Sequence, residues 1–120
     1  MRWYKYLYVG DNAKNAKYDI IVKTTEHRLQ LDAYLITLPS NEKNLLDIIP
    51  ARELAQPYYK NREVSERLFV VGIAKGEEEA QLVSAKILMD THRATNGFRV
   101  RSYLHCAQTA REAEEMEEMK

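Results

Sequence analysis

The stretch Leu68-Phe-Val-Val-Gly-Ile-Ala-Lys-Gly-Glu-Glu-Glu-Ala80 decides the fold. An apolar run rich in β-branched residues reaches a glycine and then continues into three glutamates, which favour the positive end of a helix dipole. This order predicts a buried strand at 68–74 and a crossover helix at 77–93. Short strands that alternate with helices predict an α/β fold with a mostly parallel sheet, in which the crossovers are right-handed.

Four further segments supply candidate strands for a four- or five-stranded sheet with helices packed on it. Residues 2–9 alternate, with three tyrosines on one side, and residues 31–38 are apolar on both faces, as in an interior strand. Residues 45–49 form either a short strand or a single packed turn. Residues 98–104 place two arginines on one face, which predicts a solvent-facing or edge strand.

The remaining segments are predicted to be helices and one loop. We expect a helix at 12–25 because Asp11 and Asn12 can cap it, although its β-branched residues also fit a strand. Pro50 begins a short helix at 50–56, and 58–67 is a polar loop. A charged helix at 106–120 has only a thin apolar stripe, so it docks, pairs with another chain or frays.

Composition limits the class of protein. At 120 residues the chain has room for one domain, predicted as an α/β domain at 1–105 with an acidic helical tail at 106–120. The 18 basic and 18 acidic side chains cancel, so charge alone predicts no nucleic-acid binding. Without a signal-peptide region or a membrane-length apolar run, we expect a cytoplasmic protein that contacts no membrane.

Cysteine and histidine usage predicts no metal site. The single cysteine, Cys106, excludes an intramolecular disulfide and a zinc site built from cysteine pairs. His27, His92 and His105 are widely spaced and show no metal-ligand pattern. No cofactor motif is present, and we expect no cofactor.

The segment Gly72-Ile-Ala-Lys-Gly76 looks like a phosphate-binding turn, but it matches neither the P-loop pattern nor the dinucleotide pattern. The three glutamates that follow Gly76 would repel a phosphate from the helix start. We therefore expect a structural turn, in which Gly72 permits close packing and Gly76 permits a sharp exit.

Polar side chains follow three of the predicted strands and form the candidate ligand-binding site. If those strands are parallel neighbours, their carboxyl ends meet at one edge of the sheet, where ligands of such folds bind. The competing interpretation is that these are ordinary cap and turn residues. The candidate residues are Asp11, Asn12, Ser40, Asn41, Lys75 and Gly76.

Tyrosine is frequent, and Tyr58-Tyr59 stands beside Lys60 and Arg62. This composition suits an interaction surface, with a protein partner ahead of single-stranded nucleic acid, while the alternative is that the rings fill half-buried positions.

Six short strings resemble a group of short, uncharacterised bacterial proteins that has no assigned activity. The resemblance covers residues 4–104 and implies a bacterial cytoplasmic protein, but it carries over no functional residue. The strings are Tyr8-Val-Gly10, Ile36-Thr-Leu-Pro39, Leu46-Asp-Ile-Ile-Pro50, Gln56-Pro-Tyr-Tyr59, Val70-Val-Gly-Ile-Ala-Lys-Gly76 and Phe98-Arg-Val-Arg-Ser-Tyr-Leu104.

The leading functional hypothesis is a non-enzymatic interaction or regulatory module that forms homo-oligomers. An edge-like strand, a tyrosine-rich first strand and a helical tail too weak to stand alone all favour it. The alternative is a small anionic-ligand-binding protein or enzyme at the strand-exit edge, where Lys75 would hold the anion and Asp11 would act as a polar or acid–base group.

Overall fold

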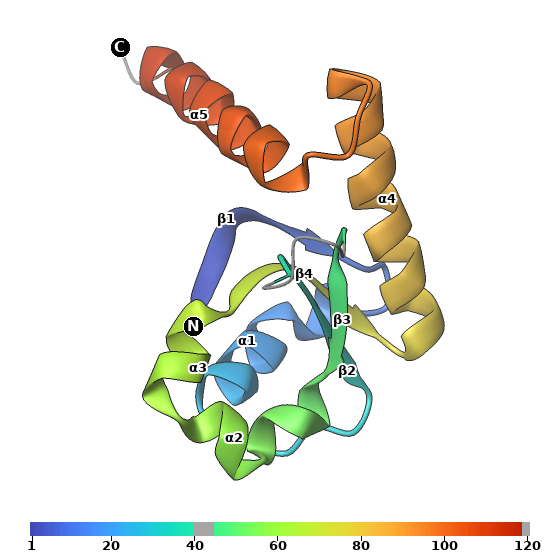
Figure 1. Ribbon diagram of the computed structural model, residues 1–120, viewed down its shortest axis with the longest axis vertical. Coiled ribbons are helices and arrows are strands. Elements are labelled where there is room, and N and C mark those ends of the chain that lie inside the picture. The colour runs from blue at the N-terminus through green and yellow to red at the C-terminus, as the bar shows by residue number, and fades with distance from the viewer. Residues whose placement is uncertain (40–44, 119–120) are drawn as a thin grey trace.

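The computed structural model describes residues 1–39 and 45–118. A four-stranded sheet lies between two layers of helices, and its strand order is β1-β4-β2-β3 (Figure 1). The strands are β1 (Arg2–Val9), β2 (Ala33–Thr37), β3 (Asp47–Pro50) and β4 (Phe69–Lys75). The α/β class is therefore confirmed, and 45–49 contributes a strand rather than a packed turn.

The prediction of a mostly parallel sheet is wrong, because the sheet is mixed. Strand β1 runs parallel to β4, whereas β2 runs antiparallel to both of its neighbours, β4 and β3. Apolar side chains on both faces of a strand show that helices cover both faces, but they carry no information about strand direction. The sequence pattern of β2 therefore predicted its burial and not its orientation.

Helices and 3-10 turns connect the strands. The predicted helix at 12–25 is split into a 3-10 turn and an α-helix, and the predicted helix at 50–56 is a 3-10 helix. The predicted loop at 58–67 is wrong, since it holds two short helices, the second capped by the Asn61 side chain, which accepts the Glu63 N–H at 2.9 Å. These elements are η1 (Lys14–Ala16), α1 (Lys17–Thr25), η2 (Ala51–Ala55), α2 (Pro57–Lys60), α3 (Arg62–Arg67), α4 (Glu77–Thr95) and α5 (Val100–Glu118).

The predicted edge strand at 98–104 is also wrong, because α5 begins at Val100 and continues to Glu118. Helix α4 ends at Thr95 and is capped by Asn96, which adopts the left-handed conformation with φ of 57° that is common at helix ends. Val100 and Leu104 are four residues apart and both buried, which is a helical spacing. The acidic tail is thus the second half of one long helix.

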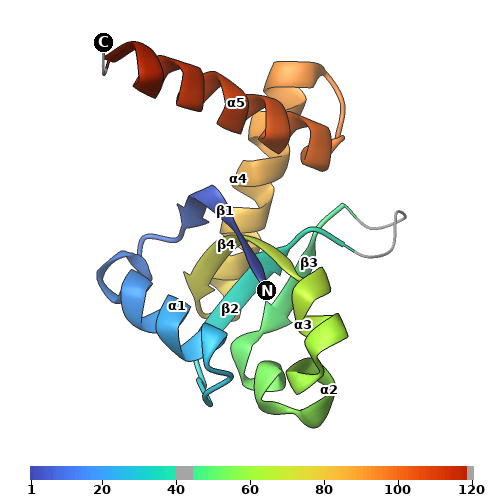
Figure 2. The ribbon, with the colours of Figure 1, turned by 90° about the vertical axis from the view of Figure 1, so that its left-hand side faces the viewer.

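Two apolar clusters pack on opposite faces of the sheet, and β4 contributes to both. Val70 and Ile73 face the side covered by α1 and η2. Val71 and Ala74 face the side covered by α4 and α5. Figure 2 shows the sheet between these two groups of helices. The stretch that decides the fold is accordingly a central strand and the start of the helix that covers it.

Strand β1 carries a large bulge. Trp3 pairs with Val70 and Tyr8 pairs with Gly72, so four residues of β1 lie opposite a single residue of β4. Bulges of this kind bend a strand away from its partner and redirect its side chains. Here the bulge carries Tyr4 and Tyr6 towards α4 and α5, while Trp3 and Leu7 pack on the opposite face.

We expect Gly72→Ala to destabilise the fold by about 1–3 kcal/mol, since an added Cβ would lie 3.0 Å from Val83 Cγ1 and 3.4 Å from Ile36 Cβ. Gly97→Ala is the matched control, because its Cβ would meet nothing closer than Thr95 Oγ1 at 4.0 Å. Urea unfolding followed by far-ultraviolet circular dichroism measures both. Equal stability of the two variants would contradict this packing.

Candidate functional site

The ends of β1 and β4 meet at one edge of the sheet, as their parallel pairing requires. The Gly10 N–H donates to Ile73 O at 2.9 Å, so the residues that follow each strand are brought together. Four of the six predicted site residues, Asp11, Asn12, Lys75 and Gly76, therefore lie at this junction.

The third strand exit does not reach this junction. Strand β2 runs the opposite way, and the Leu38 N–H donates to Phe69 O at 3.0 Å, at the start of β4. The other two predicted site residues, Ser40 and Asn41, lie outside the described residues. The expected convergence of three exits depended on a parallel β2, and the described end of β2 is at the other edge of the sheet.

The Glu79 carboxylate occupies the junction between the two exits. Its Oε2 accepts the Asn12 N–H at 2.9 Å, and its Oε1 accepts the Lys75 N–H at 3.0 Å. A Cβ at Gly10 would overlap this carboxylate, so the backbone approaches it closely. Gly76, with φ of 85°, makes the turn that returns Glu79 to this place.

This geometry gives the junction a structural role. The amides that an anionic ligand would need already bind a carboxylate of the same chain. Asp11 is exposed and pairs with Lys14 at 2.9 Å. The glutamates after Gly76 predicted a helix start and the repulsion of a phosphate, whereas the return of Glu79 to the Lys75 amide, four residues earlier in the chain, was not predicted.

Tyrosines of the bulged strand β1 bind the two long helices. The Tyr8 hydroxyl donates to Asp90 Oδ2 on α4 at 2.8 Å. The Tyr6 hydroxyl donates to Glu115 Oε1 at 3.0 Å, and the Tyr4 hydroxyl donates to Leu104 O at 3.2 Å, both on α5. Three alternating tyrosines therefore act as a row of anchors between the sheet and these helices.

Burial raises the pKa values of all three phenols, and hydrogen bonds to carboxylates raise those of Tyr6 and Tyr8 further. Burial is the largest cause for Tyr4, Tyr6 and Tyr8, and the carboxylate of Asp90 adds to the effect on Tyr8. The hydrogen bond from Tyr6, followed by that from Lys5, lowers the pKa of Glu115. The phenols therefore act as hydrogen-bond donors rather than as bases at neutral pH.

Opposite charges complete the contact between β1 and the acidic half of α5. Lys5 Nζ lies 3.3 Å from Glu115 Oε2 and 3.7 Å from Glu112 Oε1. The Arg111 guanidinium lies over the Tyr6 ring, 4.8 Å from its centroid. These exposed pairs orient the helix, and each contributes no more than about 1 kcal/mol.

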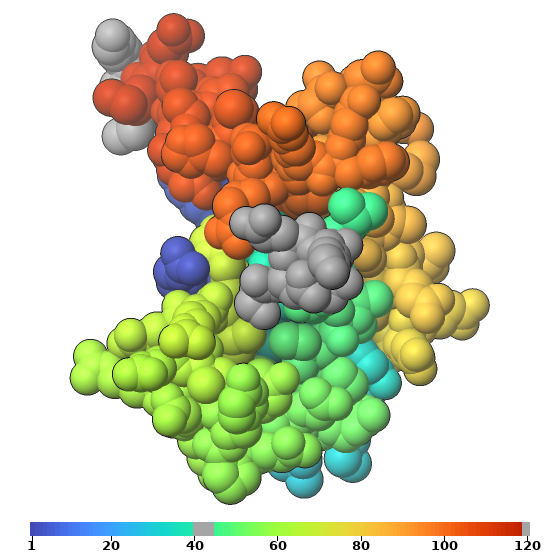
Figure 3. Space-filling model, viewed as in Figure 1, coloured from blue at the N-terminus to red at the C-terminus, as the bar shows by residue number. Residues whose placement is uncertain are grey.

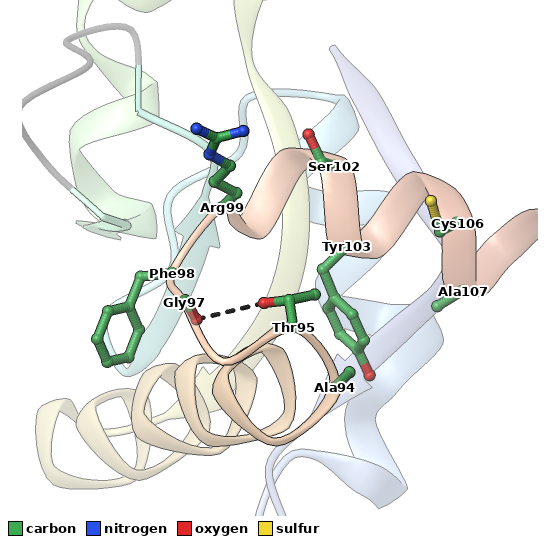
Figure 4. Close-up of a pocket in the computed structure, with 9 residues that line it drawn as sticks. All are labelled: Ala94, Thr95, Gly97, Phe98, Arg99, Ser102, Tyr103, Cys106 and Ala107. Carbon is green, nitrogen blue, oxygen red and sulfur yellow. Dashed lines mark hydrogen bonds between the residues drawn. The ribbon is translucent and has the colours of Figure 1, made fainter.

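A notch of about 700 Å³ opens between the end of α4 and the start of α5. In Figure 4 the Tyr103 ring points towards Ala94 and Thr95, whereas the side chains of Ser102 and Cys106 point away from α4. The space-filling view shows the same separation between the two helices (Figure 3). The described residues that line the notch include no aspartate, glutamate, histidine or lysine, which suits packing better than proton transfer.

The remaining sequence candidates do not form sites in the part of the chain that the structure describes. No three histidine, cysteine or carboxylate side chains gather there as metal ligands. The Tyr58 and Tyr59 rings pack edge to face at 5.1 Å, and Arg62 pairs with Glu66 at 2.9 Å, so the basic charge beside the tyrosines is partly neutralised.

No helix among residues 1–39 and 45–118 has the length and apolar character needed to span a membrane. No protein-family model matches the chain, and no curated protein or solved structure is significantly similar to it. The predicted resemblance to short bacterial proteins therefore stays a prediction, and function has to be argued from the surface.

We expect Glu79→Gln to destabilise the protein by about 1–3 kcal/mol relative to Glu78→Gln, because a charged acceptor of two amide N–H groups is lost. Both substitutions remove one negative charge from the first turn of α4. The difference between their free energies of unfolding therefore isolates the contribution of the two hydrogen bonds. Chemical unfolding at neutral pH measures this difference. Equal free energies of unfolding would show that Glu79 does not clamp the junction.

The raised pKa of Tyr8 predicts an alkaline loss of stability. The folded protein keeps the phenol proton while the unfolded chain loses it above its ordinary pKa of 10.0. The contribution is thus complete below that pH and falls as pH rises above it.

We expect stability to fall less steeply between about pH 9 and about pH 11 in Tyr8→Phe than in the wild type. Urea unfolding across this range measures the slope, with Tyr18→Phe as a control because Tyr18 is 77% exposed. An unchanged slope in Tyr8→Phe would contradict the assignment.

Proposed function

We propose that this protein is a non-enzymatic interaction module of the cytoplasm that self-associates through α5. The observation that carries the proposal is the form of this helix, which projects from the body in both ribbon views (Figures 1 and 2). The radius of gyration is 14.7 Å, compared with about 13.6 Å expected for a compact chain of this length. A projecting helix exposes much of its surface to a partner.

Helix α5 has two different faces. One face meets the body through the buried Val100 and Leu104 and continues through Arg111 and Glu115, which contact Tyr6. The opposite face is a stripe of small side chains that recur at spacings of three and four residues. We call Cys106, Ala110 and Ala113 the small stripe, and all three are exposed.

Charge is distributed along α5 against the preference of the helix dipole. Residues 99–111 contain three arginines and no acid, whereas 112–118 contain five glutamates. Isolated helices are stabilised by acids at the first turn and bases at the last, and α5 has neither. Lys5 compensates Glu112 and Glu115, while Glu114, Glu117 and Glu118 form no ion pair with any described residue.

An antiparallel pair of α5 helices satisfies both features. The basic start of each helix then lies beside the acidic end of the other, and the two dipoles oppose each other favourably. Arg99 and Glu117 lie beyond the two ends of the small stripe. With Ala110 near the two-fold axis, Arg99 of one copy lies about 5 Å along the helix axis from Glu117 of the second copy, which is about one helical turn and within reach of the arginine side chain. Ala110 lies near the two-fold axis, opposite its own counterpart, as an isologous interface requires.

The charge pattern predicts a mixing experiment. In Arg99→Glu and in Glu117→Lys, like charges face each other across the antiparallel pair, so each variant alone is expected to dissociate relative to the wild type. A mixture of the two restores opposite charges at both ends and is expected to form a heterodimer. Multi-angle light scattering and sedimentation velocity at low salt measure the three states.

The controls make this experiment specific. Both substitutions improve the match between α5 and its own dipole, so loss of association cannot come from loss of helix stability. Swapping the Arg62–Glu66 pair of α3 is the matched charge control. A wild-type protein that stays monomeric at micromolar concentration would contradict the proposal. So would a mixture of the two variants that stays dissociated, if each variant alone has also dissociated.

The small stripe gives an independent prediction. Ala110→Glu places two carboxylates near the two-fold axis and is expected to reduce association by at least about tenfold. Ala85→Glu makes the same change at an exposed alanine of α4, between the exposed Leu82 and Met89. If Ala85→Glu dissociates the protein and Ala110→Glu does not, the interface lies on α4 and the proposal is wrong.

A further inference from the structure

A cavity of about 290 Å³ lies where the start of β1, the start of β4 and the first turns of α5 meet. It is distinct from both the strand-exit junction and the small stripe of α5. Its lining residues are Arg2, Tyr4, Leu38, Phe69, Arg101, Leu104, His105 and Gln108.

Three basic side chains from two elements line this cavity. Arg2 comes from β1, and Arg101 and His105 come from α5. Among the described residues that line the cavity there is no carboxylate, and neither arginine forms an ion pair with any residue in the described part of the chain. Arg101 also lies in the first turn of α5, at the positive end of its dipole, where no acidic residue offsets the charge.

The position of Arg2 is fixed by its surroundings. Its backbone N–H donates to Leu68 O at 2.8 Å, and its guanidinium lies 5.4 Å from the centroid of the Phe69 ring. The stacked arginine retains N–H donors at its edge, which suits forked recognition of anionic oxygens. The aromatic contact therefore holds a cation without neutralising it.

The inner wall of the cavity is apolar. Tyr4, Leu38 and Leu104 are 5%, 8% and 2% exposed, and the Tyr4 hydroxyl is committed to Leu104 O. Phe69 adds a partly buried aromatic ring. A ligand that fits such a site has an anionic head towards the arginines and an apolar body against this wall.

Size and charge together narrow the ligand class. At about 30 Å³ for each water-sized group, the cavity holds roughly ten non-hydrogen atoms, which is more than a free phosphate ion occupies. Two guanidinium groups and an imidazole approach from different elements, so they can bind the several oxygens of a dianion better than the two oxygens of a carboxylate.

We infer that this cavity binds a small organic phosphate monoester, with Arg2 and Arg101 on the phosphate and the apolar wall on its organic part. This inference goes beyond the proposed self-association and does not depend on it. Lys75 was the predicted anion-binding residue, whereas the two arginines, which pair with no carboxylate in the described part of the chain, lie at the other edge of the sheet, beside the start of β4.

Isothermal titration of the full chain with phenyl phosphate, inorganic phosphate and benzoate tests the inference. We expect saturable binding of phenyl phosphate with a dissociation constant below about 1 mM, and weaker binding of the other two. Arg2→Gln and Arg101→Gln are each expected to weaken phenyl phosphate binding about tenfold or more. Circular dichroism of each variant verifies that the fold is intact.

Arg93→Gln is the matched control, since Arg93 is an exposed arginine near the end of α4 and lies outside both the residues that line this cavity and the proposed α5 interface. We expect it to leave phenyl phosphate binding unchanged. Equal losses in Arg93→Gln and Arg101→Gln would show non-specific attraction to surface arginines and overturn the site. Absence of saturable binding, or benzoate binding as tightly as phenyl phosphate, would overturn the ligand class.

Discussion

Burial of Val100 and Leu104 in the apolar cluster that also contains Tyr4 of β1 sets the direction of α5, and both proposals depend on that direction. The Tyr4 hydroxyl bonds Leu104 O, and Tyr6 and Lys5 hold Glu115 further along the helix. Because one face of the helix is held in this way, the opposite face with the small stripe is turned outward. The same contact places Arg101 beside Arg2 at the basic cavity.

The bulge in β1 explains how one short strand supports all of these contacts. A regular strand beside β4 would keep its side chains in register with that partner, and Tyr4 and Tyr6 could not both reach α5. In the bulge, four residues of β1 lie opposite a single residue of β4, and this extra length carries the two tyrosine rings to the helix. The strand therefore joins the sheet to the helix on which both proposals depend.

The two proposals share a helix but use different faces of it. Cys106, Ala110 and Ala113 of the small stripe are exposed, and Arg99 and Cys106 border the notch beside α4, while Arg101, Leu104 and His105 border the cavity. A ligand that bridges Arg2 and Arg101 would tie the start of α5 to β1 and reduce its freedom to move. The proposed self-association and the proposed phosphate binding are therefore separable by mutation, although both would act on the position of α5.

The sequence predicted the elements with a strong local signal. Strand 68–74 and helix 77–93 follow from the apolar run, the glycines and the glutamates at the helix start, and the structure confirms both elements. Strand direction was not encoded in this way. Residues 98–104 alternate as a strand does, yet Val100 and Leu104 also fit a helix face, and only their packing on Tyr4 decides between the two.

Only part of the candidate site was predicted, because strand direction has no local sequence signal. The exits of β1 and β4 meet as expected, because parallel neighbours end together. No local pattern showed that β2 is reversed or that Glu79 returns to bind the Asn12 and Lys75 amides. The basic cavity was missed because Arg2 and Arg101 are nearly a hundred positions apart in the printed sequence and meet only through the fold.

Site-directed disulfide formation tests the antiparallel α5 pair most directly. In that pair Cys106 lies opposite Ala113 of the second copy, so two Cys106 side chains are separated by roughly 10 Å along the helix axis and cannot form a disulfide. Ala110→Cys in a Cys106→Ser background places two thiols near the two-fold axis. The account predicts a disulfide-linked dimer for this variant and none for the wild type under the same mild oxidant. Rapid cross-linking of wild-type Cys106, with none at position 110, would contradict it.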